Sequence, residues 1–351
     1  MSAKITAMSK LRLLAKTIVL QSASSLGLTK ALIRRESGKG ILILCYHGVV
    51  PGSHAGEFLY RNTVSIREFS NHLEFLSRRF HFISPSDLTV AATEGKPLPE
   101  RPAMISFDDG YRNNLMYAAP VLRKFGISSL FSVVTGLIGT PDVLWTESVN
   151  FCVLDWPGKT MPVPQKEGGY KDVVLPSSPE DRVQLAHMVR QACKEMDREA
   201  LEEYLGLLRS EVPSTRMDLY NELLAFMSWD EVRTLHSQGF AIASHTVSHP
   251  ILSRIPDADL NRELGRSKQR IEDELSVPCP WLIYPNGQKP DYSPDVFRRA
   301  REVGYKIGFT ARGGYGRLGS ELFEVDRIGV PGHRLMPEFE ARVSGFWRYI
   351  T

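Results

Sequence analysis

Hydrophobic and polar positions follow a repeating pattern along this chain, in which short apolar runs alternate with longer amphipathic segments. Runs with the length and hydrophobicity of buried strands lie at 41–47, 82–83, 103–107, 129–134, 240–243, 281–284, 306–310 and 323–328. Apolar residues at helical spacing occupy the segments 65–80, 86–92, 117–125, 228–239, 260–275 and 293–304. This order predicts parallel βαβ units, and therefore an α/β fold.

Residues 140–225 interrupt the pattern. The stretch 157–179 has the composition of a loop, whereas 179–208 is charged and carries apolar residues at helical intervals, namely Leu185, Val189, Leu201 and Leu205. No cluster of reactive side chains is found in this region of the sequence. We therefore expect a helical cap inserted into the larger domain, with a function that its sequence does not indicate.

Length and composition fit either one large α/β barrel or two modest domains. The chain has 351 residues, of which 24% are charged and 42% hydrophobic, as in an ordinary globular protein. Its four cysteines are far apart and show no C-x-x-C spacing: Cys45, Cys152, Cys193 and Cys279. Neither a zinc knuckle nor a disulfide framework is indicated, which fits a reducing compartment.

The segment 1–36 carries the positive charge of the chain. Seven Lys and Arg residues against one Glu give it a charge of +6. Because the whole chain has a net charge of +3, residues 37–351 together carry −3. Nucleic-acid binding is therefore not expected. Within residues 8–35, one apolar helix face suited to an anionic membrane surface can form from Leu11, Leu14, Ile18 and Leu26. A helix packed on its own domain, or a frayed end, fits equally well. Charges interrupt the segment too often for a transmembrane helix, and no signal-peptide cleavage site follows it.

Two adjacent acids, Asp108 and Asp109, follow the buried run 103–107 and precede Gly110. Because like charges repel, one carboxylate of such a pair is usually held by a cation, and the proton affinity of the other is set separately. Taken alone, the segment is equally typical of a strand followed by an Asp-Gly turn.

Two histidines, His245 and His249, follow the buried run 240–243. A spacing of four residues lets two imidazoles converge on one metal ion. With one carboxylate of the acid pair they would make a three-ligand site with an open position, as in catalytic zinc centres. Such a site lowers the pKa of a bound water, and the second carboxylate could take its proton. The residues therefore predict metal-assisted hydrolysis of an amide or ester.

Two further candidates stand at strand ends. His47 ends the first apolar run, although a single histidine in this position is more often a hydrogen-bonded structural residue. The turn at Pro285-Asn286-Gly287 points backbone N–H groups outward, which suits either a plain loop or a cradle for developing negative charge.

These motifs resemble those of the polysaccharide deacetylases, carbohydrate esterase family 4, which share the fold of the rhizobial chitooligosaccharide deacetylase. The resemblance spans roughly residues 40–335 and rests on Phe107-Asp108-Asp109-Gly110 and His245-Thr246-Val247-Ser248-His249, in the family's order. Tyr46-His47 and Tyr284-Pro285-Asn286-Gly287 are most similar to the subgroup that deacetylates exopolysaccharides such as poly-N-acetylglucosamine. The resemblance implies a distorted (β/α) barrel of about seven parallel strands within residues 37–351, with the site at the strands' C-terminal ends.

The resemblance also implies residue roles. Asp109, His245 and His249 would hold one divalent ion, for which we expect Zn²⁺ first and Ni²⁺, Co²⁺, Fe²⁺ or Mn²⁺ as alternatives. Asp108 would be the general base, and His47 the general acid that protonates the leaving amine.

One expected element of the family pattern is missing. Many members place an arginine that orients the base at the position occupied here by Ile283, so we expect Arg327, or else Arg112, to supply that charge.

The backbone N–H of Asn286 would stabilise the oxyanion, a contribution of about 2.7–4 kcal/mol for one such donor. His333 is a second candidate for the general acid.

The substrate expected from the resemblance is an acetamido sugar in a bacterial surface polysaccharide or its lipid-linked precursor. Because exported members of the family carry signal peptides, a chain without one is expected in the cytoplasm, with peripheral inner-membrane contact through residues 8–35. Two other functions stay open: a metal-dependent amidase or deformylase acting on a non-polymer substrate, and a non-catalytic glycan-binding scaffold. The sequence does not specify the sugar, its chain length, the metal, the linkage of the acetyl group through N or O, or the oligomeric state.

Overall fold

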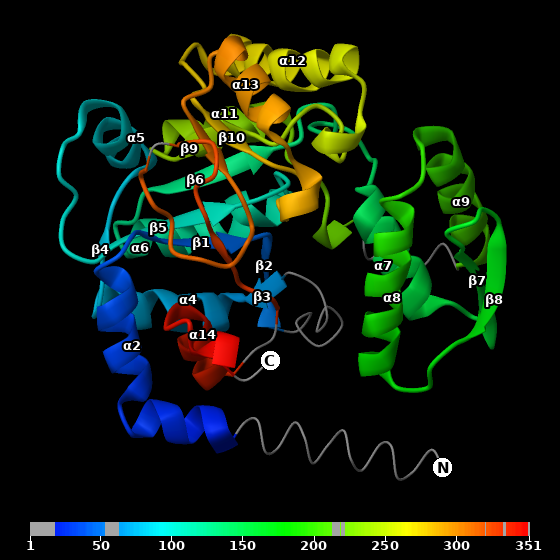
Figure 1. The fold of residues 1–351 in the computed structure, drawn as a ribbon, viewed down its shortest axis with the longest axis horizontal. Coiled ribbons are helices and arrows are strands. Elements are labelled where there is room, and N and C mark those ends of the chain that lie inside the picture. Colours follow the sequence, from blue (N-terminus) through cyan, green and yellow to red (C-terminus); the bar gives the residue numbers. More distant parts are fainter. Residues whose placement is uncertain are drawn as a thin grey trace.

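A curled parallel sheet forms the centre of the molecule, in a computed structural model that describes residues 18–52, 63–212, 218, 222–319, 321–332 and 335–349 (Figure 1). Its strands lie in the order β11 (Ile307–Phe309), β10 (Trp281–Ile283), β9 (Ala241–Ser244), β6 (Ser129–Val133), β5 (Pro102–Phe107), β1 (Leu42–Tyr46) and β12 (Ile328–Gly329). A further strand, β4 (His81–Phe82), pairs with β5, and all pairings in this sheet are parallel.

The segment 322–329 brings the two edges of the sheet together. Val325 forms a parallel bridge with Phe309 of β11, whereas Ile328 is in register with Leu44 of β1. The sheet is therefore the distorted (β/α) barrel that the resemblance implied. The strand expected at 323–328 is much shorter than predicted, because the segment passes from one neighbouring strand to the other and cannot pair with either along its whole length.

Successive side chains along each strand point to opposite faces of the sheet, and this produces two apolar layers. Fully buried residues that face the barrel interior form one cluster, which includes Ile43, Met104, Leu130, Ala243 and Ile283. Their neighbours in sequence, such as Leu42, Ile105 and Phe131, belong to a larger cluster that joins the sheet to its helices. Because side chains fill the body of the barrel, a substrate site can form only at one of its ends.

Helices cover the outside of the barrel. They are α4 (Ile66–Ser77), α5 (Pro85–Glu94), α6 (Ala119–Lys124), α11 (Trp229–Ser237), α12 (Asp257–Leu275), α13 (Pro294–Val303) and α14 (Met336–Val343). Capping boxes at Ser65 and Ser228 begin α4 and α11, which lie in the segments predicted as helical at 65–80 and 228–239. A π-helical turn at Asn114–Ala118 precedes α6, and a separate parallel pair is formed by β2 (Gly48–Val50) and β3 (Thr63–Ser65).

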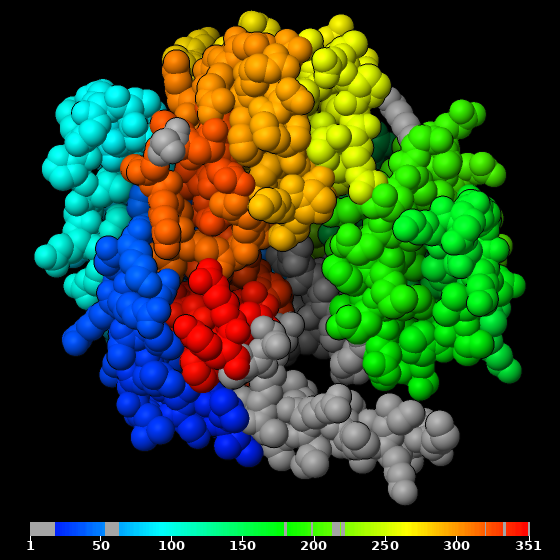
Figure 2. All heavy atoms as spheres, viewed as in Figure 1, coloured from blue at the N-terminus to red at the C-terminus, as the bar shows by residue number. Residues whose placement is uncertain are grey.

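Residues 145–212, which we call the cap unit, stand beside the barrel with an apolar cluster of their own (green in Figures 1 and 2). The cap unit consists of α7 (Trp145–Asp155), β7 (Thr160–Pro164), β8 (Tyr170–Val174), α8 (Pro179–Cys193) and α9 (Arg198–Glu211). The expectation of a loop at 157–179 was wrong, because β7 and β8 form an antiparallel hairpin. Pro162 and Pro164 are tolerated there because both strands of a two-stranded hairpin are edge strands.

The N-terminal part of the described chain is helical. Residues 18–25 and α2 (Leu28–Ser37) precede the barrel, and Ser24 donates a hydrogen bond of 2.6 Å to Glu340 of α14. Among the described helices, none combines the length and the hydrophobicity that a membrane span needs. The division into an N-terminal segment at 1–36 and a barrel at 37–351, with a cap inserted at about 140–225, stays a prediction.

Candidate active site

The acid pair stands at the C-terminal end of β5, where Asp108 and Asp109 are both 4% exposed. The amide of Asp108 donates to the carbonyl of Tyr46 at 2.9 Å and so extends the pairing with β1. Asp109 then adopts a φ of 75°, a left-handed conformation that is uncommon outside glycine. This bend directs the two neighbouring carboxylates to different partners.

Asp108 is held by a buried arginine from the other end of the chain. Arg327 donates from Nη1 to Oδ1 and from Nη2 to Oδ2, both at 2.8 Å. The thiol of Cys45 and the hydroxyl of Ser132 also reach this carboxylate, at 3.1 and 3.2 Å. Burial by itself raises the pKa of Asp108, but the guanidinium outweighs burial and holds that pKa well below its usual range. Asp108 is therefore ionised at neutral pH.

Asp109 faces the two predicted histidines. Its Oδ1 lies 3.5 Å from Nε2 of His245 and 3.8 Å from Nε2 of His249, and one ligand atom from each of the three residues lies within 4.8 Å of the others. Nitrogen and oxygen ligands about 2.0–2.2 Å from a tetrahedral Zn²⁺ are themselves about 3.3–3.6 Å apart. The donor types and their spacing thus fit a divalent ion.

A hydrogen bond orients the imidazole of His245 toward this point. Nδ1 of His245 is 2.8 Å from the carbonyl oxygen of Ile283, which leaves Nε2 as the ligand atom, a common arrangement for metal-binding histidines. Burial lowers the pKa of His249 to about 3, helped by the charge of His245. Burial also opposes a charge on His245, but hydrogen bonding to Asp109 and the charge of Asp108 raise its pKa overall.

A buried glutamate on α12 holds the turn that carries the histidines. Glu263 is 4% exposed and accepts hydrogen bonds from the amides of Val247 and Ser248, at 2.8 and 2.9 Å. It also accepts one from the Ser248 hydroxyl at 2.7 Å, while the amide of His249 donates to Thr246. Because these bonds define the turn, Glu263 positions the candidate metal ligands.

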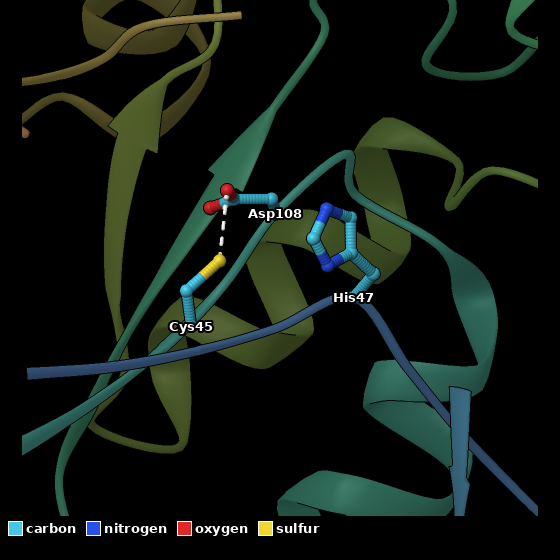
Figure 3. Close-up of side chains that lie close together, drawn as sticks. All are labelled: Cys45, His47 and Asp108. Atoms are coloured by element: carbon cyan, nitrogen blue, oxygen red, sulfur yellow. Dashed lines mark hydrogen bonds between the residues drawn. The ribbon is translucent and has the colours of Figure 1, made fainter. Parts of the chain in front are cut away.

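A second group of potential ligands, Cys45, His47 and Asp108, lies next to the first. Figure 3 shows the Cys45 thiol directed at the Asp108 carboxylate, with the His47 ring beside them. A cation bound here would share the Asp108 oxygens with the guanidinium of Arg327, which repels it. Burial also raises the pKa of the Cys45 thiol, so the thiolate that binds metals is not formed. Of the two groups, Asp109, His245 and His249 are therefore the better candidate for a metal site.

Strained backbone is concentrated at this site. Of the six non-glycine residues with positive φ in the described chain, four lie here: Asp109, Thr246, His249 and Asn286. Each such residue costs of order 1–3 kcal/mol and persists only where its surroundings impose the conformation. The tertiary structure therefore stabilises an arrangement of the two motifs that the local sequence disfavours.

A cavity of about 300 Å³ joins these groups. On the barrel side it is lined by residues that include His47, Asp108, Asp109, His245, His249 and Asn286. On the other side it is lined by the cap unit, through Thr146, Glu147, His187, Arg190, Gln191 and Lys194. All predicted site residues that line this cavity come from the C-terminal ends of strands or the turns that follow them.

The remaining predicted residues have different positions. Arg112 forms an ion pair with Glu231 at 2.6 Å on the surface, and His333 lies outside the described residues.

Sequence reasoning missed Glu263 and the cap-unit residues of the cavity. Glu263 follows His249 by fourteen positions inside an ordinary amphipathic helix, so no local pattern distinguishes it from a solvent-exposed acid.

Fold and site together define a class: a distorted (β/α) barrel with a carboxylate and two histidines at the C-terminal end of its strands. The family model for polysaccharide deacetylases matches residues 186–308, which include His245 and His249 but not the acid pair. Over residues 186–308 the chain is therefore similar to the polysaccharide deacetylase family.

Individual relatives are distant. A Bacillus subtilis protein named as a polysaccharide deacetylase, YxkH, is 21% identical over 306 residues, 87% of this chain and 76% of that protein. The Escherichia coli poly-β-1,6-N-acetyl-D-glucosamine N-deacetylase is 26% identical over 102 residues, 29% of this chain and only 15% of that longer protein.

Solved structures share the fold. IcaB from Ammonifex degensii aligns with a TM-score of 0.55 at 19% identity, over 88% of this chain and 97% of that one. The Streptococcus pyogenes deacetylase PplD, solved with acetate, aligns with a TM-score of 0.53 at 17% identity, over 83% and 92% of the two chains. At these identities the likeness concerns the fold.

Replacing Arg327 by Met should destabilise the protein by about 3–5 kcal/mol, because the charge of Asp108 would remain buried without its partner. The additional change Asp108→Asn should restore part of this loss. Urea unfolding of both single variants and the double variant, all treated with chelator, measures the coupling. Arg78→Met is the control, since Arg78 pairs with Glu74 on the surface and should cost about 0–1 kcal/mol. Strictly additive effects of the two buried changes would contradict the coupling.

Replacing Glu263 by Ala should weaken metal binding about 10–100-fold, because the turn carrying both histidines loses its buried acceptor. Competition with a chromogenic chelator measures the zinc affinity, and circular dichroism checks the fold. Glu167→Ala, in the exposed tip of the β7–β8 hairpin, is the matched control and should leave the affinity unchanged. A folded Glu263→Ala protein with undiminished zinc affinity would show that Glu263 has no positioning role.

Proposed function

We propose that this protein hydrolyses the N-acetyl group of an acetamido sugar in a bacterial surface polysaccharide or its lipid-linked precursor. The observation that carries the proposal is the position of an arginine-held carboxylate, Asp108, beside the cluster of Asp109, His245 and His249 on one cavity. These last three residues would hold one divalent ion, for which Zn²⁺ is our first choice. When bound, such an ion polarises a carbonyl group and lowers the pKa of water.

In the proposed reaction Asp108 takes a proton from the attacking water. Its ion pair with Arg327 keeps the carboxylate ionised, so it is always in the proton-accepting form. The same ion pair lowers the proton affinity of Asp108, which makes it a weak base for ordinary water. General base catalysis by a carboxylate in this position contributes about 10²–10⁴-fold when the proton donor is activated.

Two other groups complete the proposed reaction. The water oxygen adds to the acetyl carbon, and the backbone N–H of Asn286 donates to the negatively charged oxygen that forms. His47 protonates the sugar nitrogen as the C–N bond breaks, which releases acetate and a free amine. Its half-buried ring lines the cavity beside Asp108, and its Nδ1 has no hydrogen-bond partner among the described residues.

The relatives support the sugar substrate. One of them is named for N-deacetylation of poly-β-1,6-N-acetyl-D-glucosamine, and a structural neighbour was solved with acetate. The proposal therefore favours a deacetylase over a deformylase or an amidase acting on a non-polymer substrate. Burying the charged side chains of Asp108 and Arg327 next to the candidate metal ligands costs free energy. A glycan-binding scaffold would not need this arrangement.

Zinc-loaded protein should release acetate from β-1,4- or β-1,6-linked N-acetylglucosamine oligomers, and chelator should abolish the release. Asp108→Asn should lower kcat by about 10²–10⁴-fold while zinc content is retained, because the ligands are unchanged. A coupled acetate assay with metal analysis measures both quantities. The control variant is Asp142→Asn, at an exposed position in a loop.

The outcomes separate the rival functions. Acetate release that chelator leaves intact would overturn the metal-dependent proposal, and turnover of formylated sugars alone would identify a deformylase. Glycan binding without turnover of any amide would identify a scaffold.

We also propose that the protein works in the cytoplasm and touches the inner membrane through its N-terminal helices. Exposed apolar side chains on the helix at 18–25, in the turn that follows it and in α2 include Ile18 (53%), Leu26 (84%) and Leu28 (44%). Exposed bases follow on α2, at Lys30, Arg34 and Arg35. Residues 8–17 of the predicted segment lie outside the described chain. An apolar face flanked by bases is suited to anionic lipid.

Vesicles that contain phosphatidylglycerol should bind the full chain, whereas neutral phosphatidylcholine vesicles should bind it weakly. Leu26→Asp should reduce this binding about tenfold or more, because it removes a buried apolar contact and adds repulsion. Sedimentation with the vesicles measures the bound fraction. Val174→Asp is the control, since Val174 is 74% exposed on the cap unit. Equal binding of the two variants, or none by the wild type, would end the membrane proposal.

A further inference from the structure

Helix α8 of the cap unit has two chemically different faces. Ala186, Val189 and Cys193 are buried in the apolar cluster of the cap unit. The opposite face presents His187, Arg190, Gln191 and Lys194 to the cavity of the candidate active site. Spacings of three and four residues place these four side chains in one row along the helix. The acid pair and the histidines of the barrel thus face Arg190 and Lys194 across the cavity.

Lys194 attaches this wall to the barrel. Its Nζ lies 3.1 and 3.3 Å from the two carboxylate oxygens of Asp291, and the Lys194 side chain is only 10% exposed. Arg254 donates to the carbonyl oxygen of Lys194 at 2.8 Å. Asp291 also accepts from the amide of Gln288, in the loop that carries Asn286. The charge of Lys194 is thus compensated, and its role is to place α8 over the site.

Arg190 differs from Lys194 in its environment. Its Nε is buried and has no hydrogen-bond partner among the described residues. Burial lowers the pKa of Arg190, and the nearby charge of Glu147 opposes this effect only in part. The Arg190 side chain as a whole is half-buried at the cavity, so its guanidinium can take a bound ligand as a hydrogen-bond partner. A guanidinium donates two parallel hydrogen bonds to a carboxylate or phosphate, a geometry that lysine lacks.

We propose that Arg190, with His187 beside it, binds an anionic group of the substrate while the acetyl group lies at Asp108 and Asp109. This inference rests on the proposed function and specifies its substrate class: an acetamido glycan that carries a carboxylate or phosphate close to the sugar being deacetylated. A cavity of about 300 Å³ is at the small end of ligand sites, so both groups must lie on the same or adjacent sugar units.

The charge distribution also sets the orientation of such a substrate. Arg190 attracts the anionic group toward α8, on the side of the cavity opposite Asp108 and Asp109. Arg190 is thus a specificity-determining residue, and it takes no part in the proton transfers at Asp108 and His47.

Isothermal titration calorimetry on chelator-treated full-length protein tests the proposal without requiring turnover. The ligands are a neutral N-acetylglucosamine tetramer, a tetrasaccharide alternating N-acetylglucosamine with glucuronate, and UDP-N-acetylglucosamine. At least one anionic ligand should bind about tenfold more tightly than the neutral tetramer, and the advantage should shrink as salt is raised. Preference for the glucuronate ligand would identify a carboxylate as the bound group, and preference for the UDP-sugar a phosphate.

Arg190→Gln should remove this preference, a loss of about 1.4 kcal/mol for a tenfold change. Arg190→Lys should retain part of it, and His187→Gln, at an exposed position, should reduce it without affecting the fold. Lys171→Gln removes one exposed charge on β8 and should change nothing. An unchanged preference in folded Arg190→Gln, or equal binding of all three ligands to the wild type, would overturn the proposal. Absence of acetate release would refute the proposed reaction and leave this binding result standing.

Discussion

Two neighbouring carboxylates buried at the end of one strand are the constraint on which this site depends. Asp108 and Asp109 cannot both be charged in the barrel unless each has a partner of its own. Arg327 from the segment 322–329 compensates the first with two hydrogen bonds, and the histidines after β9 face the second. The barrel must therefore bring β1, β5, β9 and β12 together before either acid can be buried. The chemistry of the site and the closure of the sheet are consequences of the same pairing.

The ion pair of Arg327 and Asp108 also explains a departure from the family pattern. Where the resemblance led us to expect the orienting arginine, this chain has Ile283, whose side chain belongs to the barrel interior and whose carbonyl oxygen contacts His245. A guanidinium needs only to point its in-plane N–H donors at the carboxylate. The arginine can therefore come from another strand. The position of the arginine in the sequence changes, whereas the charge beside Asp108 is retained.

The cap unit lines the cavity without contributing to the acid pair or the histidines. It is inserted between β6 and β9, so the acid pair and the histidines are 137 positions apart from Asp108 to His245. This insertion separates the two motifs in the sequence, and the region matched by the family model, 186–308, contains only the second motif. In space, α8 faces the motif residues across the cavity. The cap unit and the barrel nevertheless keep separate apolar cores.

The sequence by itself determined the elements of the barrel and the residues at the strand ends, because buried runs, capping boxes and the two motifs are encoded within a few consecutive positions. The hairpin at 160–174 was not predicted, since Pro162 and Pro164 indicate a loop unless it is known that both strands are edges. Only the tertiary structure decided which arginine meets Asp108, which glutamate holds the histidine turn and which helix faces the site. Arg327 and Asp108 are 219 positions apart, and a contact over that separation depends on how the strands pair, which no local pattern records.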